Sequence, residues 1–336
     1  MEEQGMKKRL FCALALILVL SLLSLPLSGC GTNTADDGKI SIVCTLFPQY
    51  DWLRNIVGDV EGIELTLLIA NGSDPHSYQP TAADILKISN CDMIVFTGAD
   101  SDTWVQEALE RANNKDIVQV PLSALEGMTL HDVSSHSHTH GEHEHHLEDT
   151  HGAFDEHIWL SLSNAVTASR QLSSRLCALD PSNAKTYTEN AEEYIKSLLK
   201  LSSDYASAAA SASAEDKFVL FADRFPFVYL LSEYGIEYQA AFDGCSADVD
   251  ADFGTVLTLI KEAEHHGAAY VCVTESSDKA LATTVISSAK HTQMEILTFN
   301  SMQSLGSDDI DGGASYLGIM EENLKLLKTA INARSK

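Results

Sequence analysis

The sequence alternates, in two separate stretches, between short apolar runs and segments whose apolar residues have helical spacing. The apolar runs lie at residues 40–47, 63–69, 93–97 and 117–120, and then at residues 218–222, 237–241, 269–274 and 296–299. Near-continuous apolar runs of this length are typical of parallel strands covered on both faces. Because parallel strands need helical crossovers between them, the alternation predicts an α/β fold with two doubly wound lobes and parallel sheets.

A long segment without a helix breaker separates the two stretches. Residues 181–214 begin with a proline, which is favoured at the first helical position, and contain no glycine and no second proline. A helix of about 30 residues would be about 45 Å long, enough to span both lobes. The Ala/Ser-rich end at residues 206–214 could instead be a flexible linker, since serine lowers helix propensity. We therefore predict an N-terminal lobe over residues 40–180, a linking helix over 181–214, and a C-terminal lobe over 215–336.

The first 29 residues have the features of an export signal. A short basic segment, Lys7 to Arg9, precedes an apolar stretch at residues 10–25 that is short for spanning about 30 Å of hydrocarbon. The following Leu27-Ser28-Gly29-Cys30 resembles the lipobox of bacterial lipoproteins. That resemblance implies cleavage before Cys30, acylation of Cys30, and a tether over residues 30–39. We therefore expect an extracytoplasmic lipoprotein anchored to a membrane.

Charge and cysteine content restrict the possible ligands. The formal net charge is −26 at pH 7, which argues against a nucleic-acid partner and suits a cationic ligand. Besides Cys30, the exported chain would hold an odd number of cysteines, Cys44, Cys91, Cys177, Cys245 and Cys272, so they cannot all pair within one chain. No CxxC motif is present, which excludes a zinc ribbon and a thioredoxin-like motif.

Histidine is concentrated in one tract, residues 131–151. Eight of the thirteen histidines lie there: His131, His136, His138, His140, His143, His145, His146 and His151. Imidazole is the commonest protein ligand for zinc-like ions, and the irregular spacing with Ser, Thr and Gly favours a loop over a fixed cage. We interpret the tract as a low-affinity metal collector. The alternatives are a purification tag, which would be terminal and unbroken, and a solvated linker without function.

Several polar residues directly follow the predicted strands, where ligands of doubly wound sheets bind. They are His76, Asp100, Asp223, Glu275 and Asn300, joined by His157 after the histidine-rich tract. His76 lies in a loop rich in Gly, Pro and Asn, where a histidine has no core to fill. His157 could instead be a core histidine, Asp223 could pair with Arg224, and Glu275 and Asn300 could cap helices. A cleft between the lobes would bring these side chains together.

Three segments resemble a known family. Residues 72–81, Gly-Ser-Asp-Pro-His-Ser-Tyr-Gln-Pro-Thr, resemble the signature loop of the zinc- and manganese-binding solute receptors of bacterial ABC importers. Residues 155–160 resemble that family's second metal motif, with Glu156 where proline is usual, and residues 227–235 resemble its third motif. The histidine-rich tract before the second motif points to the zinc branch. The resemblance covers nearly the whole exported chain.

The resemblance implies two α/β lobes joined by one long helix, with a metal in the cleft. It implies His76 and His157 as ligands from the first lobe. The third family ligand falls at Arg224, whose guanidinium cannot bind a cation, so we predict Asp223 in its place. The fourth position falls at Asn300, a neutral amide, and a thiolate at Cys245 is a further candidate. Two histidines, one aspartate and water or Asn300 would satisfy four-coordinate zinc.

These observations predict capture of zinc outside the cytoplasm and its delivery to an ABC permease in the membrane. A manganese receptor of the same family, and a surface zinc-binding adhesin or sensor lipoprotein, are the alternatives. An enzyme is not expected, because the sequence has neither the HExxH motif of zinc hydrolases nor a GxSxG nucleophile elbow.

Overall fold

The computed structural model describes residues 38–70, 72–132, 154–242, 251–290 and 294–332. Several predictions fall outside these residues: the signal peptide, Cys30, Cys245 and every histidine of the 131–151 tract except His131. They remain predictions. Among the described residues, no helix is both long enough and apolar enough to cross a membrane.

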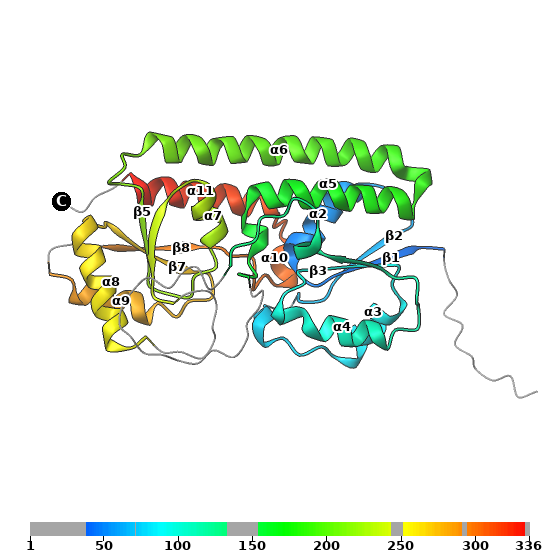
Figure 1. The fold of residues 1–336 in the computed structure, drawn as a ribbon, viewed down its shortest axis with the longest axis horizontal. Coiled ribbons are helices and arrows are strands. Elements are labelled where there is room, and N and C mark those ends of the chain that lie inside the picture. Colours follow the sequence, from blue (N-terminus) through cyan, green and yellow to red (C-terminus); the bar gives the residue numbers. More distant parts are fainter. Residues whose placement is uncertain (1–37, 71, 133–153, 243–250, 291–293, 333–336) are drawn as a thin grey trace, which may run out of the picture. The chain divides into compact units, whose positions relative to one another are not determined.

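The first lobe is built on a four-stranded parallel sheet in the order β2-β1-β3-β4. Its strands are β1 (Ile40–Cys44), β2 (Ile63–Leu67), β3 (Met93–Phe96) and β4 (Val118–Pro121). Its helices are α2 (Phe47–Val57), α3 (Ala82–Asn90), α4 (Thr103–Glu110) and α5 (Leu162–Leu179). All four residues of β3 are buried, as expected for a strand covered on both faces. In Figure 1, α2 and α5 lie on one side of this sheet, and α3 and α4 lie on the other.

The second lobe repeats the same strand order, β6-β5-β7-β8, again with all strands parallel. Its strands are β5 (Phe218–Phe221), β6 (Glu237–Ala240), β7 (Tyr270–Thr274) and β8 (Glu295–Phe299). Its helices are α7 (Val228–Glu233), α8 (Phe253–His266), α9 (Ala280–Ser288), α10 (Ser307–Asp311) and α11 (Tyr316–Ile331). The predicted architecture of two doubly wound lobes is confirmed.

Helix α6 (Ala184–Ser211) joins the lobes and runs along both of them, in contact with α5 and α2 in the first lobe and with α11 in the second lobe (Figure 1). Its buried face recurs at helical spacing: Tyr187, Ala191, Tyr194, Leu198, Leu201 and Tyr205. The predicted spanning helix is confirmed, and its Ala/Ser-rich end is helical as far as Ser211. A short 3₁₀ turn, Pro181–Asn183, precedes α6, and Asp180 makes no side-chain cap to a backbone N–H of that turn.

Several contacts join the lobes within the compact unit formed by residues 40–336. The Tyr205 hydroxyl of α6 donates to the Met320 carbonyl of α11 at 2.7 Å. The Trp159 Nε1 atom of the first lobe donates to the Ser301 carbonyl of the second lobe at 2.9 Å. The predicted lobe boundaries at residues 180 and 215 remain predictions, but the described contacts place the end of β8 against the first lobe.

The cysteines of the described residues behave as apolar core residues rather than as disulfide partners. Cys44, Cys91, Cys177 and Cys272 are free. Burial raises the pKa of the Cys44 and Cys272 thiols far above the ordinary value, so both stay protonated. This agrees with the interpretation of Cys44 and Cys272 as small core residues.

Candidate metal centre

His76 is held by a tight turn between β2 and α3. A short 3₁₀ turn, Pro75–Ser77, carries it, and the Asp74 carboxylate accepts the His76 backbone N–H at 2.9 Å. Proline at the first position of the turn and aspartate before it are the residue types that start such turns. The His76 side chain is 19% exposed, so it is available to a ligand while its backbone is fixed.

His157 lies deeper, in the segment that leads into α5. It precedes the buried 3₁₀ turn Ile158–Leu160 and is itself only 1% exposed. Its Nδ1 atom lies 2.9 Å from Asp155 Oδ1, which also accepts the His157 backbone N–H at 2.9 Å. A carboxylate that binds Nδ1 fixes the tautomer with the proton on Nδ1, so that Nε2 is the atom that can bind a metal. His157 is thus buried, as it would be if it were only a core histidine. Its ring, however, is oriented as that of a metal ligand.

Asp155 is suited to orienting His157. Burial raises the pKa of Asp155, but the charge and hydrogen bonds of His157 outweigh burial and hold that pKa below its ordinary value. The Tyr229 hydroxyl of α7 donates to the Asp155 carbonyl at 2.6 Å. Tyr229 belongs to the third segment of the family resemblance. This hydrogen bond from the second lobe fixes the backbone next to His157 in the first lobe.

The two imidazoles meet at a residue that the sequence analysis missed. The ring centroids of His76 and His157 are 5.5 Å apart. The amide nitrogen of Gln303 lies 3.0 Å from His76 Nε2 and 2.8 Å from His157 Nε2. The Nδ1 sides of the two rings face Glu156 and Asp155, so both rings turn Nε2 toward this amide. Two imidazole nitrogens therefore converge on one point, an arrangement that can bind a divalent ion.

The loop after β8 presents Gln303. Asn300 ends that strand, and its amide oxygen accepts the Met302 N–H at 2.8 Å. Met302 adopts a left-handed backbone conformation, φ +64°, which turns the chain toward the first lobe. The Glu275 carboxylate accepts the Ser301 N–H and hydroxyl, each at 2.8 Å. Asn300 and Glu275 therefore shape the loop, and Gln303 is the residue that reaches the two histidines.

Asp223 does not join the histidines. Its Oδ2 atom accepts the Thr274 N–H at 2.9 Å and the Thr274 hydroxyl at 2.7 Å, and its Oδ1 atom accepts the Arg224 N–H at 2.8 Å. Within the described ranges, no group of three or more His, Cys, Asp or Glu side chains is placed to hold a metal. His76, His157 and Asp223 therefore do not form such a group in this structure, and the ligand set that adds Asn300 stays a prediction. The Arg224 guanidinium, which the sequence offered as an alternative partner of Asp223, pairs with Asp74 at 2.7 Å.

Glu156, which stands where the family has proline, lies behind His76. Its Oε2 atom is 3.6 Å from His76 Nδ1, and its Oε1 atom accepts the Ser101 N–H at 3.0 Å. The carboxylate therefore adds negative charge on the side of the ring that faces away from the point of convergence. Each histidine has a carboxylate on its Nδ1 side, Asp155 for His157 and Glu156 for His76.

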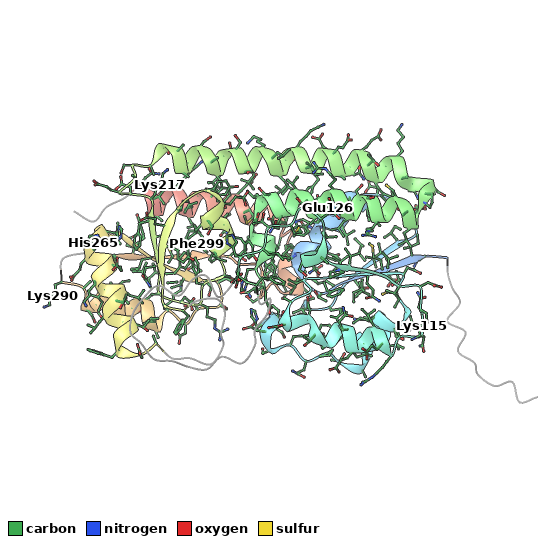
Figure 2. The ribbon with its side chains drawn as sticks, viewed as in Figure 1. Lys115, Glu126, Lys217, His265, Lys290 and Phe299 are labelled. Atoms are coloured by element: carbon green, nitrogen blue, oxygen red, sulfur yellow. The ribbon has the colours of Figure 1, made fainter. Side chains whose placement is uncertain are left out.

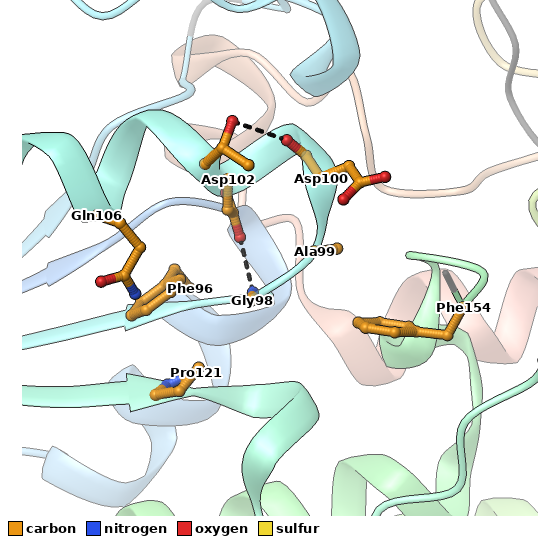
Figure 3. A pocket seen from close by; sticks show the side chains of 9 residues that line it. Phe96, Gly98, Ala99, Asp100, Asp102, Gln106, Pro121 and Phe154 are labelled. Carbon is orange, nitrogen blue, oxygen red and sulfur yellow. Dashed lines mark hydrogen bonds between the residues drawn. The ribbon is translucent and has the colours of Figure 1, made fainter. Parts of the chain in front are cut away.

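Asp100, another residue predicted after a strand, lines a different cavity (Figure 3). This first-lobe cavity has a volume of about 370 Å³, and neither histidine lines it. The neighbouring Asp102 carboxylate accepts the Gly98 N–H at 3.0 Å, and burial raises the pKa of Asp102 to about 6. The contacts of Asp102 stabilise the turn after β3. Asp100 therefore has no place at the histidine pair.

His131 is the one member of the histidine-rich tract in the described part of the chain. Its backbone N–H donates to the Tyr229 hydroxyl at 3.1 Å, and its ring packs edge-on against that of Tyr229, with centroids 4.6 Å apart. The tract thus starts beside the residue that binds the Asp155 carbonyl.

Comparisons with known proteins identify the family of this chain. The family model described as zinc-uptake complex component A periplasmic matches residues 42–330. The zinc-binding lipoprotein AdcA of Streptococcus pneumoniae (strain ATCC BAA-255 / R6) is 31% identical over 312 residues, which are 93% of this chain and 60% of AdcA. The high-affinity zinc uptake system protein ZnuA of Bacillus subtilis (strain 168) is 28% identical over 325 residues, 95% of this chain and 98% of that protein. The chain thus spans about 60% of the length of AdcA.

Solved structures share the fold. The Zn(II)-bound ZnuA-like domain of Streptococcus pneumoniae AdcA superposes with a TM-score of 0.69 at 28% identity, covering 88% of this chain and 100% of that domain. The metal-dependent lipoprotein YcdH of Bacillus subtilis superposes with a TM-score of 0.70 at 27% identity, covering 87% of this chain and 99% of that one. Since the family model matches most of the sequence and both lobes have the corresponding fold, this chain belongs to the ZnuA family, zinc-uptake complex component A periplasmic.

Proposed function

We propose that this protein captures zinc outside the cytoplasm and delivers it to an ABC permease, as a solute receptor rather than as an enzyme. The observation that carries the proposal is the convergence of His76 Nε2 and His157 Nε2 on one point, 3.0 and 2.8 Å from Gln303 Nε2. The relatives AdcA and ZnuA, a zinc-binding lipoprotein and a zinc uptake protein, support zinc as the cargo. The lipobox-like segment ending at Cys30 supports a lipid anchor on the outer side of a membrane.

The proposed ligand set is His76, His157 and Gln303. Rotation of the Gln303 amide would turn its oxygen toward the point where its nitrogen now lies, and this oxygen could then bind the ion. Asp223 and Asn300 accept backbone N–H groups of Thr274 and Met302 and are not among the side chains that contact the two histidines. Two imidazoles suit zinc better than manganese, which prefers oxygen ligands, so zinc is the favoured cargo.

An uptake experiment tests the function as a whole. Deletion of the gene should abolish growth under zinc limitation and accumulation of radioactive zinc, and the wild-type gene should restore both. A gene encoding His157→Ala should not restore them. Normal growth and zinc accumulation in the deletion strain would contradict the transport function, and lost surface attachment in that strain would favour the adhesin alternative.

A carboxylate at position 303 should strengthen the site. We expect Gln303→Glu to bind zinc at least about tenfold more tightly, because it places a negative charge beside a divalent cation that otherwise has only neutral ligands. Competition with a coloured zinc chelator measures the change. The matched control is Gln106→Glu, which adds the same charge at the first-lobe cavity. Equal affinity of Gln303→Glu and wild type would show that position 303 does not bind the ion.

The histidine-rich tract should account for weak binding only. Deletion of residues 134–150 removes six of the thirteen histidines: His136, His138, His140, His143, His145 and His146. We expect calorimetry to lose the weak sites and keep one tight site, because irregularly spaced imidazoles bind zinc without forming a closed shell. Loss of the tight site in the deletion variant would contradict the role of a collector.

A further inference from the structure

Arg224 brings a positive charge to the edge of the proposed zinc site. It follows β5 in the second lobe, and its Nη1 atom lies 2.7 Å from Asp74 Oδ2 in the first lobe. The other oxygen of Asp74 accepts the His76 N–H at 2.9 Å. The Asp74 carboxylate therefore connects the Arg224 guanidinium to the turn that carries His76. Both partners of the ion pair remain about one-third exposed, at 35% and 34%, so the pair is accessible to a solute.

The protein donors at the histidine pair carry no charge of their own. Neutral imidazoles and an amide are the groups that His76, His157 and Gln303 can offer, while Asp74 is engaged by Arg224 and Asp223 by Thr274. Zinc prefers four donors and brings two positive charges. These three residues therefore leave at least one coordination position of zinc unfilled and do not neutralise its charge. Another group must supply both.

A cavity adjoins the site and has room for such a group. It measures about 740 Å³ and is lined in part by Asp74, Arg224 and Gln303, the last of which touches both imidazoles. Hydroxyl side chains add hydrogen-bonding groups to its wall: Thr274, Ser276, Ser277 and Ser304. Small-molecule sites typically measure about 300–1,000 Å³, whereas one water occupies about 30 Å³ of liquid. The space suits a small organic molecule better than a single ion.

We propose that the site takes zinc together with a small chelating carboxylate, an amino acid or a hydroxy acid. The chelator completes the coordination of zinc beside His76, His157 and Gln303, and its free carboxylate binds Arg224 inside the cavity. A guanidinium binds carboxylates through two parallel hydrogen bonds, which neutral side chains cannot reproduce. This inference rests on the proposed capture of zinc by the two histidines. The competing explanation is that Arg224 only joins the lobes through Asp74.

Equilibrium dialysis with radioactive citrate or radioactive histidine tests the proposal on the full exported chain. In carboxylate-free buffer we expect tight binding of zinc alone and no retention of either chelator without zinc. With equimolar zinc, the wild-type protein should retain about one equivalent of at least one of the two. Retention of citrate only would identify a hydroxy acid, and retention of histidine only would identify an amino acid. Tight zinc binding with neither chelator retained would overturn the chelate proposal and leave zinc capture intact.

Variants of Arg224 test its role. We expect Arg224→Gln to weaken retention of the chelator by about ten- to a hundredfold, the loss typical of a charged hydrogen-bonded pair, and Arg224→Lys to weaken it less. Arg175→Gln is the matched control, since Arg175 is exposed on α5. Chelator retention by Arg224→Gln at the wild-type level would overturn the assignment of Arg224. Absence of zinc binding by the wild type in every buffer would overturn zinc capture itself, and this inference with it.

Discussion

Replacing His157 with alanine should lower the zinc affinity of the protein by about 100- to 1,000-fold. Zinc sites of four ligands in small peptides have binding free energies of about 10–16 kcal/mol, or about 2.5–4 kcal/mol for each ligand. A tenfold change in affinity corresponds to about 1.4 kcal/mol. We expect the full loss of one ligand at His157 because this residue is 1% exposed and oriented by Asp155. Water from the solvent cannot take the place of the imidazole as a ligand unless the surrounding structure rearranges. Competition against a coloured chelator measures the loss.

Two further variants make this result specific. His76→Ala should weaken zinc binding in the same way, and its side chain is 19% exposed, so its removal disturbs the core less. His265→Ala is the matched control, because His265 is exposed at the end of α8 in the second lobe (Figure 2). Tight zinc binding retained by both His76→Ala and His157→Ala would show that the ion binds elsewhere. The urea midpoint of the metal-free protein separates lost affinity from lost folding.

The fold was predictable because burial on both faces leaves a strong signal in the sequence. The apolar run at residues 93–97 is typical of an interior strand, and β3 (Met93–Phe96) is buried at every position. The spanning helix was predictable because residues 182–214 contain no breaker, and α6 extends from Ala184 to Ser211. Helix boundaries were less certain. The segment predicted to be helical from residue 181 begins with a 3₁₀ turn, Pro181–Asn183, and the α-helix starts at Ala184.

The site was predictable only where a side chain had no structural use. His76 in its Gly- and Pro-rich loop was such a residue, and its place next to His157 agrees with the prediction. Asp223 and Asn300 were predicted because they come first after their strands. Backbone N–H groups at this edge of the sheet also need acceptors, however, and Asp223 accepts that of Thr274 while Asn300 accepts that of Met302. Gln303 could not be found in this way, because the left-handed turn at Met302 sets its direction.

Replacing Tyr316 with alanine should lower the free energy of unfolding by about 3–5 kcal/mol, the loss typical of removing a buried aromatic ring. Tyr316 begins α11 and is fully buried, with its ring edge-on to Trp52 at a centroid distance of 5.4 Å. Its backbone N–H donates to Asp51 of α2 at 2.9 Å. The ring thus fills the region where the last helix of the second lobe packs on the first lobe. Urea denaturation of the metal-free protein measures the change, which is a large fraction of the about 5–15 kcal/mol typical of native proteins.

The hydroxyl of Tyr316 connects this packing to the metal centre. It donates to the Trp159 carbonyl at 2.7 Å, two residues after His157, and burial raises the pKa of Tyr316 well above its ordinary value, so the donor proton is kept. Tyr316→Phe should therefore cost about 1–3 kcal/mol, because it keeps the ring but leaves a buried carbonyl without its partner. Leu199→Ala on the exposed face of α6 is the control and should change stability by less than about 0.5 kcal/mol. A loss in Tyr316→Phe as small as in this control would show that the ring alone stabilises the junction. A loss in the expected range would instead mean that the backbone beside His157 depends on a hydrogen bond from the opposite lobe.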